Sequence, residues 1–120
     1  MSTTIPKSGF LDKAREDAAT LHQSIERGIA QGESRMHAAL DRSSAQARDL
    51  AKSIQAEAAS ADAALRAKLN EAAAQAEAVA RSGESGRPRP MLEAAQKLSH
   101  SLSEAVAQLR AQSKNGAKHG

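Results

Sequence analysis

The feature that most limits how this chain can fold is one stripe of large apolar residues in a segment without proline. No proline occurs between Pro6 and Pro88, and residues 10–81 are rich in Ala, Glu, Gln, Arg, Lys and Leu, which favour helix. At about 100° per residue, the large apolar side chains of this segment fall within one arc of about 120° on a helical wheel, with Phe10 just outside it. We therefore predict one long amphipathic helix over residues 10–81. The stripe consists of Leu11, Leu21, Ile25, Ile29, Met36, Leu40, Leu50, Ile54, Leu65, Leu69 and Val79.

The spacing within the stripe predicts a nearly straight helix. Four turns of an undistorted helix take about 14.4 residues, whereas a left-handed coiled-coil seam needs about 14.0. Apolar pairs start 15, 14 and 15 residues apart along the segment. These pairs are Leu21/Ile25, Met36/Leu40, Leu50/Ile54 and Leu65/Leu69.

Two glycines interrupt the segment and leave an alternative open. Gly28 and Gly32 each cost about 1 kcal/mol relative to alanine inside a helix. A kink or turn at residues 28–34, with Ser34 capping a second helix, would account for them. Because Ile29 and Met36 keep the same phase on either side, we favour a continuous helix.

The remaining residues predict a linker and a short helix. Residues 82–90 contain two glycines and two prolines and are predicted to be a linker. Residues 91–112 are predicted to form a short amphipathic helix, which either folds back on about residues 58–80 as a hairpin or extends the rod. Residues 1–9 and the basic tail 113–120 are predicted to be disordered. The apolar seam of the short helix consists of Met91, Leu98, Leu102, Val106 and Leu109.

The expected fold class is therefore all-α. It comprises one long amphipathic helix followed by a short helix, arranged as a helical hairpin or as an extended, coiled-coil-like rod with frayed ends.

The composition argues against an enzyme. Leu, Ile, Val and Phe make up 17 of the 120 residues, Ala alone accounts for 28, and Trp, Tyr and Cys are absent. Small-molecule sites usually need large apolar and aromatic walls, so we expect no substrate and no cofactor. The four histidines show no i, i+4 pair, so no metal site is expected. Acidic residues are interspersed among the basic residues, and the sequence has only one aromatic residue that could stack on a base. Both features argue against nucleic-acid binding.

The predicted lengths point to an interaction surface. At about 1.5 Å per residue the long helix would span about 105 Å and the short one only about 33 Å, so part of the stripe should stay uncovered. We predict that the protein self-associates as a homo-oligomer or docks on a helical protein partner through this surface. The interaction stripe comprises Leu21, Ile25, Ile29, Met36, Leu40, Leu50, Ile54, Leu65, Leu69 and Val79.

Two other functions remain as alternatives. As a short, Ala-rich, cysteine-free chain with an amphipathic helix, the protein is similar in general character to the phasins that coat bacterial storage granules. This resemblance implies a reversible coat of an apolar granule or membrane surface. The low aliphatic content instead fits a largely disordered, stress-type protein. The high Ala content, the excess of Arg over Lys, and the lack of a leader or membrane span predict a bacterial, cytoplasmic protein.

Overall fold

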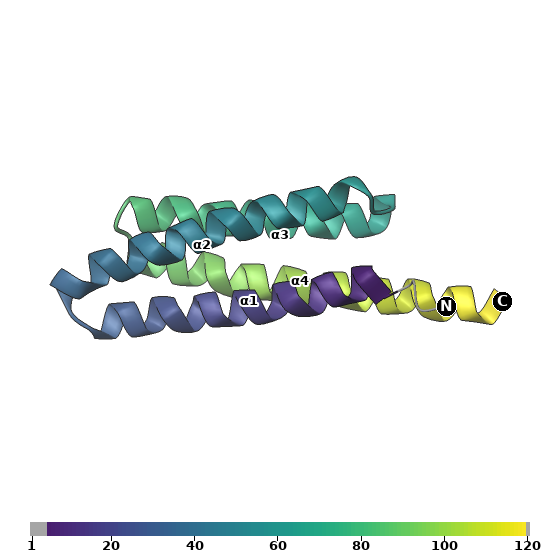
Figure 1. The fold of residues 1–120 in the computed structure, drawn as a ribbon, viewed down its shortest axis with the longest axis horizontal. Coiled ribbons are helices and arrows are strands. Elements are labelled where there is room, and N and C mark those ends of the chain that lie inside the picture. Colours follow the sequence, from purple (N-terminus) through teal and green to yellow (C-terminus); the bar gives the residue numbers. More distant parts are fainter. Residues whose placement is uncertain (1–4, 120) are drawn as a thin grey trace.

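The described part of the chain forms four helices that run alternately up and down. The computed structural model describes the backbone of residues 5–119 and the side chains of residues 10–32 and 34–111. The helices are α1 (Ile5–Ala30), α2 (Glu33–Ala59), α3 (Ala63–Glu84) and α4 (Pro88–His119). Each helix packs beside the next in the sequence, and α4 returns beside α1, so the four close into a ring (Figure 1). The bundle measures 57 × 20 × 19 Å.

The all-α prediction is confirmed, but the prediction of one long helix over residues 10–81 is wrong. This segment is divided among α1, α2 and α3, with breaks at residues 31–32 and 60–62. The physical reason is burial: a straight rod would leave its apolar stripe in water, and an isolated Ala-rich helix is marginally stable. Folding back twice lets the chain cover its own stripe.

The first break lies in the segment that the sequence had marked as the alternative to a continuous helix. Gly32 has φ 95° and ψ 163°, a conformation that is essentially restricted to glycine. It also occupies the N-cap position of α2, without a side-chain cap, in place of the predicted Ser34. The common phase of Ile29 and Met36 does not exclude a turn, because the apolar faces of two helices joined by a tight turn must also face each other. A preserved phase therefore does not distinguish a hairpin from a continuous helix.

The second break, at residues 60–62, was not predicted. Asp62 is the N-cap of α3, and its carboxylate accepts a hydrogen bond from the backbone N–H of Leu65 at 3.0 Å. The guanidinium of Arg66 donates to the carbonyl oxygens of Ala58 (3.2 Å) and Ala61 (2.8 Å). These bonds satisfy backbone groups that helix ends leave without partners. The turn is thus specified by polar side chains, without glycine or proline.

The third turn is shorter than the predicted linker 82–90. Helix α3 continues to Glu84, and α4 already begins at Pro88, so only residues 85–87 separate them. Pro88 and Pro90 fit the first turn of α4 because the first N–H groups of a helix have no partner within it. Gly86 takes the positive φ of 70° that this turn requires. The predicted helix 91–112 lies within α4.

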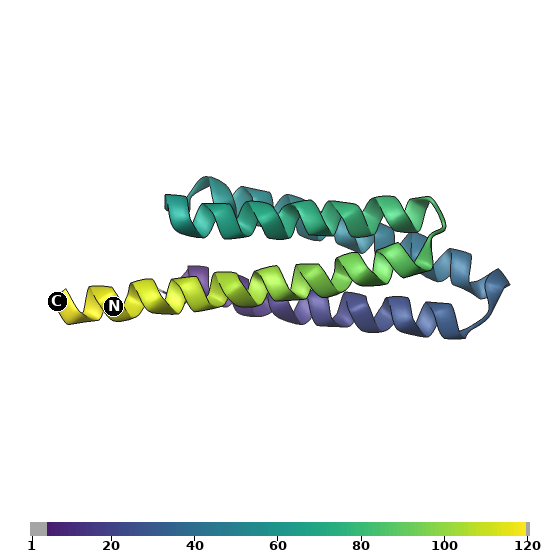
Figure 2. The same cartoon turned by 180° about the vertical axis from the view of Figure 1, so that it is seen from behind.

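Helix α4 lies antiparallel along α3, as in the predicted hairpin (Figure 2). Lys68 Nζ is 3.3 Å from Glu104 Oε1, and the hydroxyl of Ser101 donates to Glu71 Oε1 at 3.5 Å. On the other side of α3, Arg48 of α2 pairs with Glu84 at 2.6 Å. Residues 5–9 and 113–119, which were predicted to be disordered, belong to helices α1 and α4, whereas residues 1–4 and 120 lie outside the described part of the chain.

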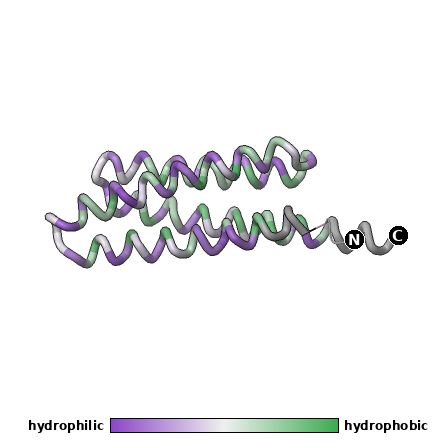
Figure 3. Tube along the Cα trace, in the orientation of Figure 1, coloured by the Kyte–Doolittle hydropathy of each residue, from purple (hydrophilic) through white to green (hydrophobic). Residues whose placement is uncertain are grey.

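Alanines and aliphatic residues alternate in the core, which runs the length of the bundle (Figure 3). Leu69, Ala72, Ala76 and Val79 of α3 are all fully buried. The small side chains allow the helix backbones to approach closely. Helices α2 and α3 approach closely at Gly83, where a Cβ would lie 3.1 Å from the carbonyl oxygen of Leu40 and against the hydroxyl of Ser44.

Candidate functional site

The interaction stripe lies inside the bundle, so the expectation that it stays uncovered is wrong. Ile29 and Met36, on either side of the first turn, are half-buried. All other members of the stripe are buried, with exposures between 0% and 8%. They are Leu21, Ile25, Leu40, Leu50, Ile54, Leu65, Leu69 and Val79. In the second-helix seam, Met91, Leu98, Leu102 and Val106 are buried and Leu109 is half-buried.

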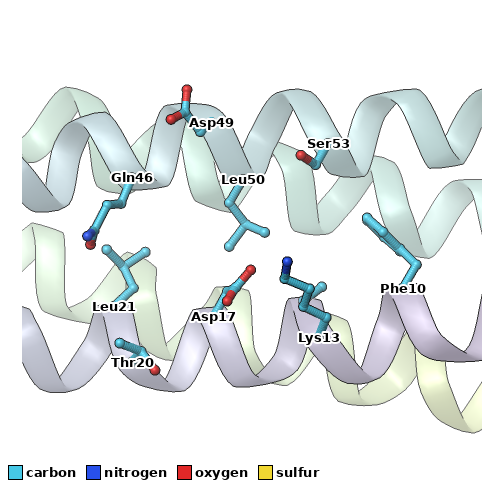
Figure 4. Close-up of a pocket in the computed structure, with 10 residues that line it drawn as sticks. Phe10, Lys13, Asp17, Thr20, Leu21, Gln46, Asp49, Leu50 and Ser53 are labelled. Atoms are coloured by element: carbon cyan, nitrogen blue, oxygen red, sulfur yellow. The ribbon is translucent and has the colours of Figure 1, made fainter.

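An apolar groove opens between α1 and α2 on one side of this core. It has a volume of about 420 Å³ (Figure 4). Apolar side chains from both helices point into it, and polar side chains form its rim. The groove is lined by Phe10, Lys13, Ala14, Asp17, Thr20, Leu21, Gln46, Asp49, Leu50 and Ser53.

The apolar groove contains the only aromatic residue of the protein. Phe10 is half-buried at one end of the groove, where its ring packs against the edge of the core. Leu50, at 8% exposed, is the least covered of the buried aliphatic side chains, and it faces α1 from the middle of α2 (Figure 4). Aromatic residues, including phenylalanine, are enriched at protein–protein interfaces.

The rim of the apolar groove carries charges of both signs. Lys13 and Asp17 project from α1, and Asp49 projects from α2 (Figure 4). Such a rim suits a polar, solvated border around an apolar contact. It contains no histidine, and it presents no nucleophile held against a base.

We also searched the described residues for a metal-binding cluster and for a helix that could span a membrane. Within residues whose side chains are described, no three His, Asp or Glu side chains gather where they would hold a metal ion. None of the helices has, in its described part, a stretch long and apolar enough to cross a bilayer.

Sequence reasoning found Leu21 and Leu50 but missed the groove that they share. Phe10 fell just outside the apolar arc, and the rim residues have no distinguishing spacing. They come together only because the reversal at Gly32 places α1 beside α2, a step that no local pattern encodes.

Comparison with known proteins adds no assignment. No protein-family model, no curated protein sequence and no solved structure matches this chain.

Proposed function

We propose that this chain is a non-enzymatic helical protein that works by assembly, with α1 as the element that engages a second copy. The observation that carries the proposal is the open apolar groove between α1 and α2. This groove lies along the one helix that is joined to the rest of the bundle by a two-residue turn, Gln31–Gly32.

The buried face of α1 suits an exchange between copies. Leu11, Ala18, Leu21 and Ile25 are each at most 2% exposed and fill the space between α2 and α4. The α1 of a second copy carries the same side chains and would fill the same space. Exchange of an identical element is a route to dimers that needs no new surface, and short hinge loops favour it.

The sequence across the hinge also supports an extended conformer. Ile29 and Met36 keep one helical phase through Gln31 and Gly32, so α1 and α2 could join into one helix when α1 swings out. In such a dimer the N-terminal part of the interaction stripe would be covered by the second copy. The stripe would then serve assembly, as the sequence suggested, although it is covered within one chain in the monomer.

Sedimentation velocity over a range of protein concentrations tests the proposal. Samples should be warmed and cooled first, because exchange requires the bundle to open. We expect a dimer whose fraction rises with concentration. Gly32→Ala, which favours helix across the hinge, should raise this fraction, and two glycines inserted after Gly32 should lower it.

The matched control inserts two glycines after Gly86, in the turn between α3 and α4. This insertion should leave the dimer fraction unchanged, because α4 does not exchange. A wild-type protein and a Gly32→Ala variant that both remain monomeric at every concentration would contradict the proposal. Charged substitutions at Ile25 or Ile54 are less informative, since both residues are fully buried and the bundle would unfold.

The alternative hypothesis, that the protein coats an apolar granule or membrane surface, predicts a different result. A coat would turn the same buried faces of the helices outward onto the surface. Binding of the wild-type protein to vesicles, with helicity retained and with loss of the Lys68–Glu104 contact, would favour this alternative. Low helicity in dilute buffer would instead favour the disordered, stress-type protein.

A further inference from the structure

A second groove between α1 and α2 lies nearer the turn that joins them and is rich in arginine. It has a volume of about 420 Å³. Arg27 of α1 and Arg35 and Arg42 of α2 line it. Because Arg35 and Arg42 are seven residues apart, they lie on one face of α2 about 10.5 Å apart, and Arg27 faces them from across the groove. We call this the arginine groove.

The three arginines have no anionic partner among the residues whose side chains are described. No described carboxylate lines the groove. Glu26, beside Arg27 in the sequence, lies 3.6 Å from His22 instead. Among the other arginines, Arg48 pairs with Glu84 and Arg66 donates to the carbonyl oxygens of the second turn, whereas Arg15, Arg89 and Arg110 have no ion pair with a described residue. The groove therefore concentrates positive charge that the described part of the fold does not use.

The other side chains around the arginine groove are small or carry hydrogen-bonding groups. At its floor α1 and α2 approach so closely that a Cβ on Gly28 would lie 2.7 Å from the Cβ of Ala39. The hydroxyls of Ser24 and Ser34 and the amide of Gln31 add donors at the sides. This arrangement gives a shallow basin with a small apolar floor and walls of hydrogen-bond donors.

We propose that the arginine groove binds a compact phosphate-bearing anion, as a free phosphate compound or as the phosphomonoester headgroup of a lipid. Guanidinium groups donate two parallel hydrogen bonds to phosphate oxygens, and serine hydroxyls donate further ones. No described aromatic residue lines the groove, so the recognised group is the phosphate itself and not a base or sugar ring. Binding would also relieve the repulsion among three like charges.

Titration calorimetry with inorganic pyrophosphate, in low-salt buffer free of phosphate, tests the proposal on the full-length protein. The groove variant is Arg27→Gln, Arg35→Gln and Arg42→Gln combined. The matched control is Arg15→Gln, Arg89→Gln and Arg110→Gln combined, which removes the same charge at exposed arginines outside the groove. We expect at least a tenfold loss of affinity in the groove variant and less than a twofold change in the control. Affinity should also fall as salt is added.

Vesicles distinguish the two sources of phosphate. Binding of free pyrophosphate assigns the groove to a soluble phosphate compound. Binding only to phosphatidylcholine vesicles that contain phosphatidic acid, with loss in the groove variant, assigns it to a lipid headgroup. Equal binding to vesicles that contain phosphatidylserine at the same charge would overturn the proposal, because it would show attraction to negative charge in general.

A measurement on the unaltered protein keeps the proposal falsifiable if the groove variant does not fold. In NMR spectra, the backbone amide signals of Gly28, Ala38 and Ala39 should shift when pyrophosphate is added, or when vesicles that contain phosphatidic acid are added if only these bind. Shifts confined to other parts of the bundle would overturn the proposal. It would also be overturned by the absence of binding to both pyrophosphate and phosphatidic acid, or by equal losses in the groove and control variants.

Discussion

Because α2 and α3 lie close together at Gly83, tertiary packing should reverse the change in stability that helix propensity alone predicts for Gly83→Ala. Gly83 lies in the last turn of α3, where helix propensity alone would favour alanine by up to about 1 kcal/mol. An added Cβ would instead meet the hydroxyl of Ser44, the terminal methyl of Met91 and the carbonyl oxygen of Leu40. We therefore expect Gly83→Ala to destabilise the protein.

The neighbours of Gly83 set the magnitude of this effect. The Met91 methyl is the end of a flexible side chain and moves at little cost, and the Leu40 oxygen, at 3.1 Å, requires a shift of a few tenths of an ångström. The Ser44 hydroxyl is the main obstacle. Overpacking typically costs about 1–3 kcal/mol, and three neighbours around the added Cβ place this case at about 2–3 kcal/mol, so after the propensity gain of about 1 kcal/mol the net loss should be about 1–2 kcal/mol.

Replacement of Ser44 should reverse the loss. The Ser44 hydroxyl is buried and has no hydrogen-bond partner among the described residues, and a buried unpaired polar group costs about 1–3 kcal/mol. Ser44→Ala alone should therefore stabilise the protein by about 1 kcal/mol. The double variant should be about as stable as Ser44→Ala alone, which gives a coupling energy of about 1–2 kcal/mol between the two positions.

Urea unfolding followed by circular dichroism measures the four free energies of this cycle, since the protein has no Trp or Tyr for fluorescence. The exposed Ser53→Ala variant controls for the change in helix propensity at Ser44. A Gly83→Ala variant as stable as the wild type would refute the close approach. A double variant as unstable as Gly83→Ala would show that the Leu40 carbonyl, and not Ser44, is the obstacle.

Three further substitutions test individual elements of the fold by the same unfolding assay. Gly32→Ala, measured at low concentration where the monomer prevails, should lose about 1–3 kcal/mol because of the positive φ, whereas a continuous helix would gain about 1 kcal/mol. Asp62→Ala should lose about 1 kcal/mol with the cap of α3, and the exposed Asp49→Ala should change stability by less than about 0.5 kcal/mol. Leu69→Ala should lose about 2–5 kcal/mol, since Leu69 is fully buried; a smaller loss would mean that the core is loosely packed.

The helical class, the residues of the apolar face and an interruption of the helix within residues 82–90 could be predicted from the sequence. Helix propensity and the apolar period act within a few residues of chain, so they can be recognised locally. The same pattern identified Leu69, Leu98 and Leu102 as apolar-face residues before any fold was known. The third turn was recognisable because the glycines and prolines of residues 82–90 restrict the backbone directly.

The number of helices, and with it the apolar and arginine grooves, was decided only by tertiary structure. At Gly32 the local sequence is compatible with both a kinked helix and a reversal. The reversal is favoured because it allows Ile25 and Leu40 to be buried within one chain. At residues 60–62 the turn depends on Arg66 reaching back to Ala58 and Ala61, a contact that exists only after the chain has reversed. Phe10 and Leu50, like Arg27 and Arg42, come together for the same reason: burial of apolar surface is a property of the whole fold, whereas helix propensity belongs to the local chain.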